Sequence, residues 1–420
     1  MNVLASFFSS KRLPAYQLLL FFGVKLCAAF VLFWIYTYYY PDRLTADIFK
    51  YFDDAQVIYQ RFVDHNYKDY LQMVLGIHND NAHFNVYYNQ MNHWNHHAES
   101  QIFSDHHVII RINALLMLFT MGWYPLHVLF FCILSFIGLM GIYHFFEPMV
   151  KNKTLLKLGV FCSPSVLIWS SGILKETIVF FCLGLIFYLL SLLNHPKSWL
   201  KHLALTCILC LILLVKAYVA LLLLPALLGY IVNERLIGRK MPNVLATYAC
   251  IYVLALGIVI CLWYGWGLIH PLGELSTKQK EFNGLVNNAT VVNPVALNEY
   301  PSSIAKNIPL SIFNVIFRPL RLQKNLLVSF TAIENWGYII FFILGLLAMV
   351  RDTALFKKHV NLFLFVISFS LSLFSLIGFT TPIIGAISRY RTPGMLLLLL
   401  LSFVYISKIN SVTDVNESNI

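Results

Sequence analysis

Long apolar runs recur along the whole chain, and they constrain its fold more than any other feature of the sequence. Several of them extend over sixteen or more residues, close to the length of about 20 residues that a helix needs to cross a bilayer. Charged residues make up 12% of the 420 residues and the mean hydropathy is +0.71, whereas a soluble domain carries about twice that share of charge. Because unpaired backbone groups are costly in lipid, such runs predict membrane-spanning helices. We therefore expect an all-α polytopic membrane protein, with residues 1–420 forming one integral domain.

About ten membrane-spanning helices are expected, with both termini in the cytoplasm. The predicted spans are residues 15–37, 125–146, 154–169, 176–193, 203–215, 217–232, 243–266, 333–350, 360–378 and 392–407. This topology places most loop cations in the cytoplasm, as the positive-inside rule requires. These cations are Lys151, Lys153, Lys197, Lys201, Arg235, Arg239, Lys240, Arg351, Lys357 and Lys358. The run 108–123 is short and contains Arg111, so it predicts an interfacial or re-entrant helix.

Two polar inserts are expected on the exoplasmic side, over about 40–123 and 267–332. The apolar run from Tyr16 to Tyr36 is interrupted only by Lys25 and predicts a retained signal anchor. A net charge of +11 would suggest nucleic acid in a soluble protein, but here it is interpreted as cytoplasmic loops and cations facing an anionic substrate. No nucleic-acid partner is expected. Cys207 and Cys210 lie in an apolar run without a second ligand pair and are interpreted as core thiols.

An amphipathic helix is predicted near the start of the first insert, over the stretch TADIFKYFDDAQVIYQ at 45–60. Thr45 can cap this helix, and Asp47 falls in its first turn, where negative charge is favourable. An apolar face is formed at helical spacing by Ile48, Phe52, Ala55 and Tyr59. Asp47, Tyr51 and Asp54 fall on a neighbouring face, with Asp53 to one side. We expect the apolar face to lie on the bilayer and the carboxylates to face the exoplasmic solution, although a plain solvated helix fits the pattern as well.

Charged residues at the predicted exoplasmic edge of the spans form a second group of candidates. The cations are Lys175, Lys216, Arg318, Arg321, Arg389 and Arg391, and the carboxylates are Glu176 and Glu334. Any one of them can be explained by snorkelling or by a structural ion pair, but charges at a membrane edge are costly and mark candidate sites. Arginine suits bidentate phosphate binding and lysine acts as a point charge. Together with the aspartates of the first insert, they predict a base that activates a hydroxyl while cations hold a phosphate leaving group.

The histidines of the first insert allow two interpretations. Eight of the fourteen lie there, and His93 and His97 have the i, i+4 spacing of a helical zinc pair. No HExxH motif accompanies them, and Asn, Tyr and Trp are equally dense, a mixture that also suits sugar binding. No metal-ligating residues are assigned, although carboxylates of the insert could hold Mg²⁺ or Mn²⁺ beside a phosphate.

Four short motifs resemble those of the GT-C superfamily of integral-membrane glycosyltransferases, in particular uncharacterised bacterial members of surface-polysaccharide loci. The motifs are TADIFKYFDD, FCSPSVLIWSSGILKE, FRPLRLQKN with IEN, and ISRYRTP. The resemblance implies a polyprenyl-phosphate (or pyrophosphate) sugar donor and a lipid- or glycan-linked acceptor at a catalytic acid in the first exoplasmic loop. It also implies the bacterial cytoplasmic membrane, with the site on the periplasmic side. By this resemblance Asp47 is the expected base, with Asp53 or Asp54 as the alternative, and Tyr51, Glu176 and Glu334 are supporting residues.

Three other functions remain open at this point. A polysaccharide polymerase or ligase acting on pyrophosphate-linked glycans would depend on Arg318, Arg389 and Arg391 more than on Asp47. A transporter or flippase would depend on polar residues within the spans, where this sequence has mostly Leu, Phe and Ile, and Lys216 would be its candidate. A scaffold would use the charges for assembly alone.

Overall fold

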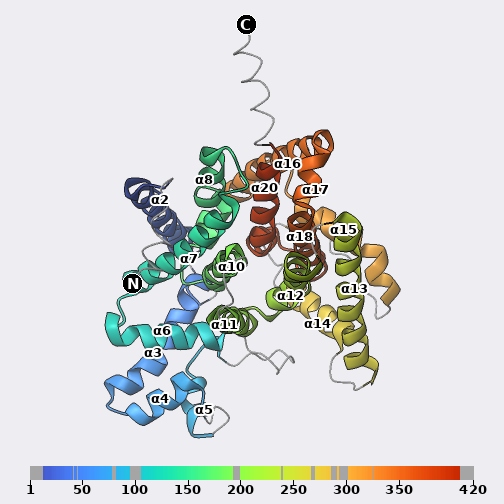
Figure 1. Cartoon of the computed structure of the whole chain (residues 1–420). Coiled ribbons are helices and arrows are strands. Elements are labelled where there is room, and N and C mark those ends of the chain that lie inside the picture. The colour runs from blue at the N-terminus through green and yellow to red at the C-terminus, as the bar shows by residue number, and fades with distance from the viewer. Residues whose placement is uncertain are drawn as a thin grey trace. The chain divides into compact units, whose positions relative to one another are not determined.

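A computed structural model describes residues 13–40, 42–44, 46–77, 82–94, 106–192, 199–237, 240–265, 270–284, 291–292, 301–323 and 325–406. Within these ranges the regular elements are all helices, joined by turns and a single isolated β-bridge between Val291 and Ile383 (Figure 1). Contacts within the chain divide it into two compact units. Unit 1 is Met1–Phe145 with Leu167–Ala220, and unit 2 is Phe146–Val166 with Leu221–Ile420.

Six helices in the described residues are long and apolar enough to cross a membrane. They are α2 with the short π-helix η1 (Ala15–Tyr39), α7 (Tyr124–Phe146), α12 with η2 (Ala217–Leu236), α13 with η3 (Met241–Tyr264), α16 (Leu326–Arg351) and α18 (Val360–Thr380). The bent pair α19 (Ile384–Tyr390) and α20 (Thr392–Ile406), with 56° between its helices, makes a seventh if it is one span. The prediction of an all-α, multi-pass membrane protein is thereby confirmed.

Three of the ten predicted spans correspond neither to these six helices nor to the bent pair, but to shorter helices. The predicted span 154–169 is two helices, α8 (Lys153–Phe161) and α9 (Pro164–Trp169), and the break falls where proline disfavours helical backbone at the residue before it. The predicted spans 176–193 and 203–215 are the 17-residue helices α10 (Lys175–Ser191) and α11 (Trp199–Val215). The number ten stays a prediction. Cys207 and Cys210 are exposed on α11, so their interpretation as core thiols is wrong.

The first insert folds, within unit 1, into a set of short helices. These are α3 (Asp47–Val63), α4 (Tyr67–Leu75), α5 (Ala82–Tyr88) and α6 (His107–Thr120). The helix α3 packs along α6 (Figure 1). Its apolar residues Ile48, Phe52 and Ala55 are buried, and the Phe52 ring packs edge-on against the rings of Tyr124 and His127 of α7. The expectation that this face lies on the bilayer is therefore wrong, because protein covers it.

Glycine allows α7 and α10 to approach closely in unit 1. A Cβ placed on Gly184 would stand 1.8 Å from the carbonyl oxygen of Gly138, and one on Gly141 would stand 2.2 Å from that of Gly184. Small residues at such crossings are typical of membrane helices, where close van der Waals packing replaces hydrophobic exclusion of water.

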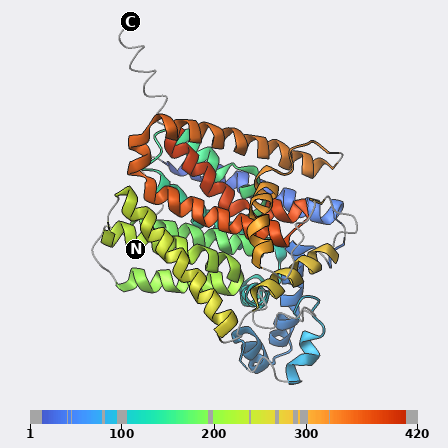
Figure 2. The same ribbon diagram turned by 90° about the vertical axis from the view of Figure 1, so that its right-hand side faces the viewer.

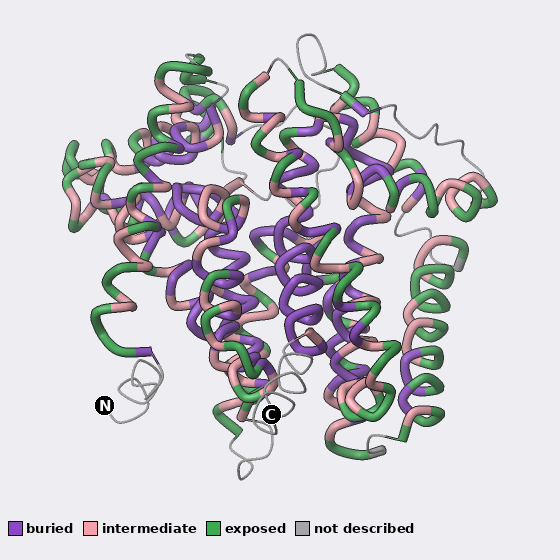
Figure 3. The backbone as a smooth tube through the Cα atoms, turned by 90° about the horizontal axis from the view of Figure 1, so that it is seen from above, coloured by how far each residue is buried: buried purple, intermediate pink, exposed green. Residues whose placement is uncertain are grey.

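The centre of unit 2 is α20, which is buried along nearly its whole length. Helices α16, α18 and α8 pack against α20, and α15 (Pro301–Phe317), α14 (Pro271–Gly284) and α13 pack against α18. The short helix α17 (Thr353–Lys358) follows α16. Figure 2 shows the red and orange helices of this unit side by side. In Figure 3 helices that are buried throughout lie next to helices with one exposed side. Exposed apolar sides such as that of α13 are typical of helices that face lipid.

Candidate functional site

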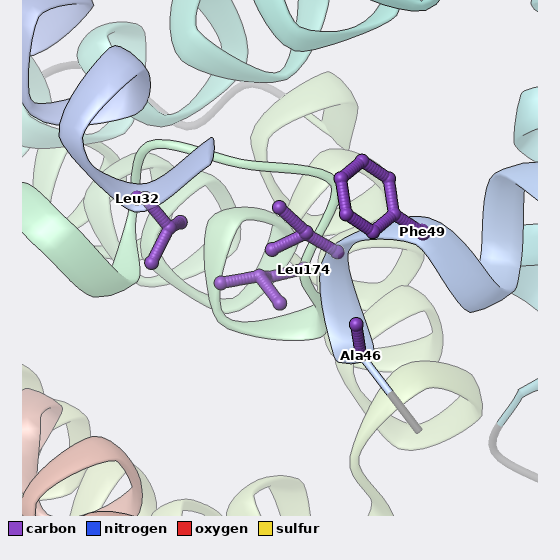
Figure 4. Close-up of a cluster of buried hydrophobic side chains, with 5 residues drawn as sticks. Leu32, Ala46, Phe49 and Leu174 are labelled. Atoms are coloured by element: carbon purple, nitrogen blue, oxygen red, sulfur yellow. The ribbon is translucent and has the colours of Figure 1, made fainter. Parts of the chain in front are cut away.

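A small hydrophobic cluster in unit 1 brings the start of α3 to the start of α10 (Figure 4). It consists of Leu32 from α2, Ala46, Ile48 and Phe49 around the first turn of α3, and Leu174 directly before α10. Asp47 and Lys175 are chain neighbours of these buried residues. Two segments far apart in the sequence therefore bring the backbone next to Asp47 and the backbone next to Lys175 into one cluster in unit 1.

The two candidates meet around the ring of Tyr51. Asp47 forms an ion pair with Lys50, one turn further along α3. The ammonium groups of Lys50 and Lys175 lie 5.1 and 5.6 Å from the centroid of the Tyr51 ring, within the range of cation–π contact. The Asp47 side chain is 25% exposed, whereas Tyr51 and Lys175 are buried. The arrangement thus holds two cations and one partly exposed carboxylate at the N-terminal end of α3.

The cap predicted for α3 differs in the structure. The residue at the N-cap position is Ala46, whose side chain makes no capping hydrogen bond; Thr45 lies outside the described residues. The first-turn placement of Asp47 agrees with the prediction. Its negative charge lies where the helix dipole favours it.

The other two predicted aspartates are occupied by structural contacts. Asp53 accepts two hydrogen bonds from the Arg43 guanidinium, at 2.8 and 2.6 Å. Asp54 is buried and accepts the backbone N–H groups of Asn92 and His93, both at 2.9 Å. Burial raises the pKa of Asp54, while these two backbone bonds act in the opposite direction. Asp54 therefore anchors the loop before α6. Asp47 and Asp53 are each paired with a cation and are 25% and 24% exposed, and Asp47 differs from Asp53 in that its partner Lys50 lies over the Tyr51 ring together with Lys175.

Glu176 and Lys216 form a buried ion pair in unit 1. Lys216 Nζ lies 2.6 Å from a carboxylate oxygen of Glu176, and the two side chains are 6% and 2% exposed. Lys216 occupies the single position between α11 and α12, as the sequence predicts. The pair links that turn to the first turn of α10, next to Lys175. This geometry is that of a structural ion pair, and phosphate binding by Lys216 stays a prediction.

Lys25 is a residue of this region that the sequence analysis did not assign to the site. Its ammonium group is buried and donates to the carbonyl oxygen of Ser170 at 2.8 Å and to the Ser170 hydroxyl at 2.6 Å. Ser135 of α7 donates to the same carbonyl at 2.7 Å. The non-helical segment before Lys175 is thus fixed by side chains from two spans. A lone lysine in an apolar run was the signal that could have indicated this role.

Glu334 and its partners form a separate cluster in unit 2. The carboxylate accepts the backbone N–H of Ser165 at 2.8 Å, the Tyr338 hydroxyl at 3.0 Å and the Ser163 hydroxyl at 3.3 Å. The Ser165 hydroxyl donates to it as well. Glu334 was expected to open a span, but α16 begins at Leu326, so this residue lies in the third turn. Its hydrogen bonds with Ser163 and Ser165 hold the start of α9 against the third turn of α16.

The four predicted arginines all belong to unit 2 and differ in exposure. Arg391 is buried, and its Nη1 donates to the carbonyl oxygens of Val315 and, at 3.0 Å, of Arg318, so that it caps the end of α15. Arg389 is buried in the last turn of α19. Arg318 and Arg321 are exposed in the turn after α15. The unit 1 cluster and these arginines are therefore two separate sets of candidates.

The aromatic residues of the first insert pack on one another. The rings of Tyr88 and Trp94 stack at 4.3 Å, and those of Trp94 and His107 at 3.8 Å. Tyr88 and Trp94 are buried, so their faces are not open to a sugar ring. His97 lies outside the described residues, so the predicted His93–His97 pair is not seen. No group of three or more metal-ligating His, Cys, Asp or Glu side chains occurs in the described part of the chain.

Comparison with known proteins adds no identification. No protein-family model, no curated protein and no solved structure matches this chain.

Proposed function

We propose that this membrane protein is a glycosyltransferase that moves a sugar from a polyprenyl-phosphate (or pyrophosphate) donor to a lipid- or glycan-linked acceptor on the exoplasmic side, in the synthesis of cell-surface polysaccharide. The observation that carries the proposal is the meeting of Asp47, Lys50 and Lys175 around Tyr51 in unit 1. A base and two cations are the groups that this transfer needs. The resemblance of the short motifs to GT-C enzymes of the bacterial cytoplasmic membrane supports the same reaction class and a periplasmic site.

The reaction follows from the roles of these side chains. Asp47 accepts the proton of the acceptor hydroxyl as that oxygen attacks the anomeric carbon of the donor sugar. The bond from this carbon to the phosphate oxygen breaks with inversion, a glycosidic bond forms, and the phosphate leaves with the electron pair. Lys50 and Lys175 balance the charge that develops on the departing oxygen. A divalent cation beside the phosphate would add to this stabilisation, and it stays a prediction.

Several predicted residues take supporting roles in this proposal. Tyr51 holds both ammonium groups against its ring, and the pair Glu176–Lys216 fixes the helix start that carries Lys175. Asp53 and Asp54 position α3 and its loop through Arg43 and the backbone.

The test is transfer of labelled sugar in proteoliposomes, from a panel of polyprenyl-phosphate hexoses to endogenous lipid acceptors. Asp47→Asn is expected to lower kcat by about 10²–10⁴-fold, the usual contribution of a general base. Asp64→Asn, which removes a surface carboxylate paired with Arg61 near the end of α3, is the matched control and is expected to keep full activity. Full transfer by a properly folded Asp47→Asn variant would overturn the proposal.

The same assay separates the main rival functions. Activity that ignores Asp47 but falls on Arg318→Gln would favour a polymerase or ligase acting on pyrophosphate-linked glycans. Lipid flux without sugar transfer, lost in a folded Lys216→Met protein but not on Asp47→Asn, would favour a flippase.

A further inference from the structure

The turn that follows α15 in unit 2 is held by side chains from other helices. Its carbonyl oxygens each accept a hydrogen bond: Arg318 from Arg391 Nη1 at 3.0 Å, Pro319 from Asn335 Nδ2 at 3.3 Å, and Leu320 from Trp336 Nε1 at 3.0 Å. Further on, Ser329 Oγ donates to the carbonyl oxygen of Gln323 at 2.7 Å. A backbone fixed at so many points presents its side chains in a defined direction.

This turn presents Arg318 and Arg321 to the outside. Both residues are exposed, and no carboxylate in the described part of the chain forms an ion pair with either guanidinium. Two neighbouring arginines without an acidic partner leave their charge and N–H groups available to an anion. Guanidinium groups suit phosphate because they donate two parallel hydrogen bonds.

A row of apolar side chains extends along α16 away from this turn. The turn contacts α16 at Asn335 and Trp336, and from there the exposed residues along one side of the helix are Trp336, Ile340, Ile343 and Leu347. The helix is one of the six candidate spans in the described residues, so the surroundings of this row are lipid chains. From Trp336 to Leu347 the helix rises about 16 Å, close to the hydrocarbon depth of one leaflet.

We propose that the Arg318–Arg321 turn binds the phosphate headgroup of an anionic phospholipid of the bilayer, with the acyl chains lying along the outer side of α16. The cations lie at the headgroup end of an apolar row that is one leaflet deep, which is the layout of such a lipid. A free phosphate ion would gain nothing from the row. The proposal does not depend on the transfer reaction, because it uses none of the residues of the unit 1 site.

The test is native mass spectrometry of the full-length, delipidated protein in detergent, titrated with phosphatidylglycerol or phosphatidylcholine. Wild-type protein is expected to prefer phosphatidylglycerol. Each arginine near a membrane surface contributes about 1 kcal/mol, or about fivefold, so Arg318→Gln/Arg321→Gln is expected to weaken this lipid about 25-fold. Phosphatidylcholine binding is expected to change little.

The matched control is Arg351→Gln/Lys357→Gln, which removes two exposed cations at the opposite end of α16. It is expected to keep the preference for phosphatidylglycerol, and so is Asp47→Asn, whatever its effect on transfer. Trp336→Phe keeps an aromatic side chain but removes the hydrogen bond to Leu320, and it is expected to weaken phosphatidylglycerol binding in a folded protein. Equal loss in the control pair, an unchanged preference in the arginine variant, or displacement of the lipid by millimolar inorganic phosphate would each overturn the proposal.

Discussion

The buried ion pair of unit 1 leads to a prediction about stability whose size can be worked out. Lys216 Nζ lies 2.6 Å from Glu176, and the side chains are 6% and 2% exposed. Lys216→Met leaves the Glu176 carboxylate without this cation in a site that water barely reaches. Breaking a buried pair from one side costs about 3–5 kcal/mol, because the remaining charge has lost its compensation. We expect the free energy of unfolding of Lys216→Met to fall by about that amount.

Removing both charges together should behave differently. Buried pairs replaced by apolar side chains of similar volume are often neutral or more stable by about 1–4 kcal/mol, so Glu176→Leu/Lys216→Met is expected to recover most of the loss. The measurement is unfolding of the full chain in mixed micelles with increasing denaturing detergent, followed by far-ultraviolet circular dichroism. Lys357→Met, at an exposed lysine of α17, is the control and should stay within about 0.5 kcal/mol of wild type. A double variant as unstable as the sum of its single variants would refute the reasoning, and so would a Lys216→Met protein with wild-type stability.

Three further predictions concern unit 1, and the first of them has its comparison residue in unit 2. Gly184→Ala is expected to lower the unfolding temperature markedly, because its Cβ would lie 1.8 Å from the Gly138 carbonyl oxygen. Gly257→Ala has nothing within 4 Å of its Cβ and should raise the free energy of unfolding by about 0.5–1 kcal/mol. Equal effects of the two variants in thermal unfolding would contradict this prediction. Burial raises the pKa of Asp54 above 3.8, so the stability linked to this carboxyl is complete below about pH 3.8 and is lost as pH rises through the raised pKa. Asp54→Asn should flatten that decline in unfolding series at several pH values, and an unchanged slope would contradict it. Lys25→Met should lower kcat/KM of transfer by up to about 100-fold, because a displacement of Lys175 by about 1 Å has an effect of that size. Lys25→Arg is expected to recover part of the activity, and equal activity of both variants and wild type would contradict the positioning role.

Much of the architecture could be predicted from hydropathy, because lipid imposes one solution on the backbone. Runs of apolar residues in a chain with 12% charge leave helices as the consistent fold, and the longest runs became α2, α7, α12, α13, α16 and α18. The position of Lys216 between two helices followed from the same pattern. The position of Asp47 in the first turn of α3 could be predicted as well, because negative charge is favourable at the start of a helix.

What covers a helix face could not be predicted, because periodicity shows that a face is apolar and not what lies on it. The apolar face of α3 meets α6 instead of lipid. Likewise, the roles of Asp53 and Asp54 depended on Arg43 and on the backbone at Asn92, which lies 38 residues away in sequence from Asp54. Pairings over such separations leave no mark in a single sequence.

The segment between α9 and α10 shows how far unit 1 is organised around the start of α10. Residues 170–174 are non-helical and buried, and non-helical backbone within a membrane protein persists only where protein groups satisfy its hydrogen bonds. Here Lys25 and Ser135 supply those bonds from two spans, although burying an ammonium group is costly. A continuous helix would have needed neither residue. It would, however, have continued the direction of α9, whereas after the break Lys175 lies over the Tyr51 ring. The buried lysine is therefore best understood as part of the structure that positions the cation of the proposed site.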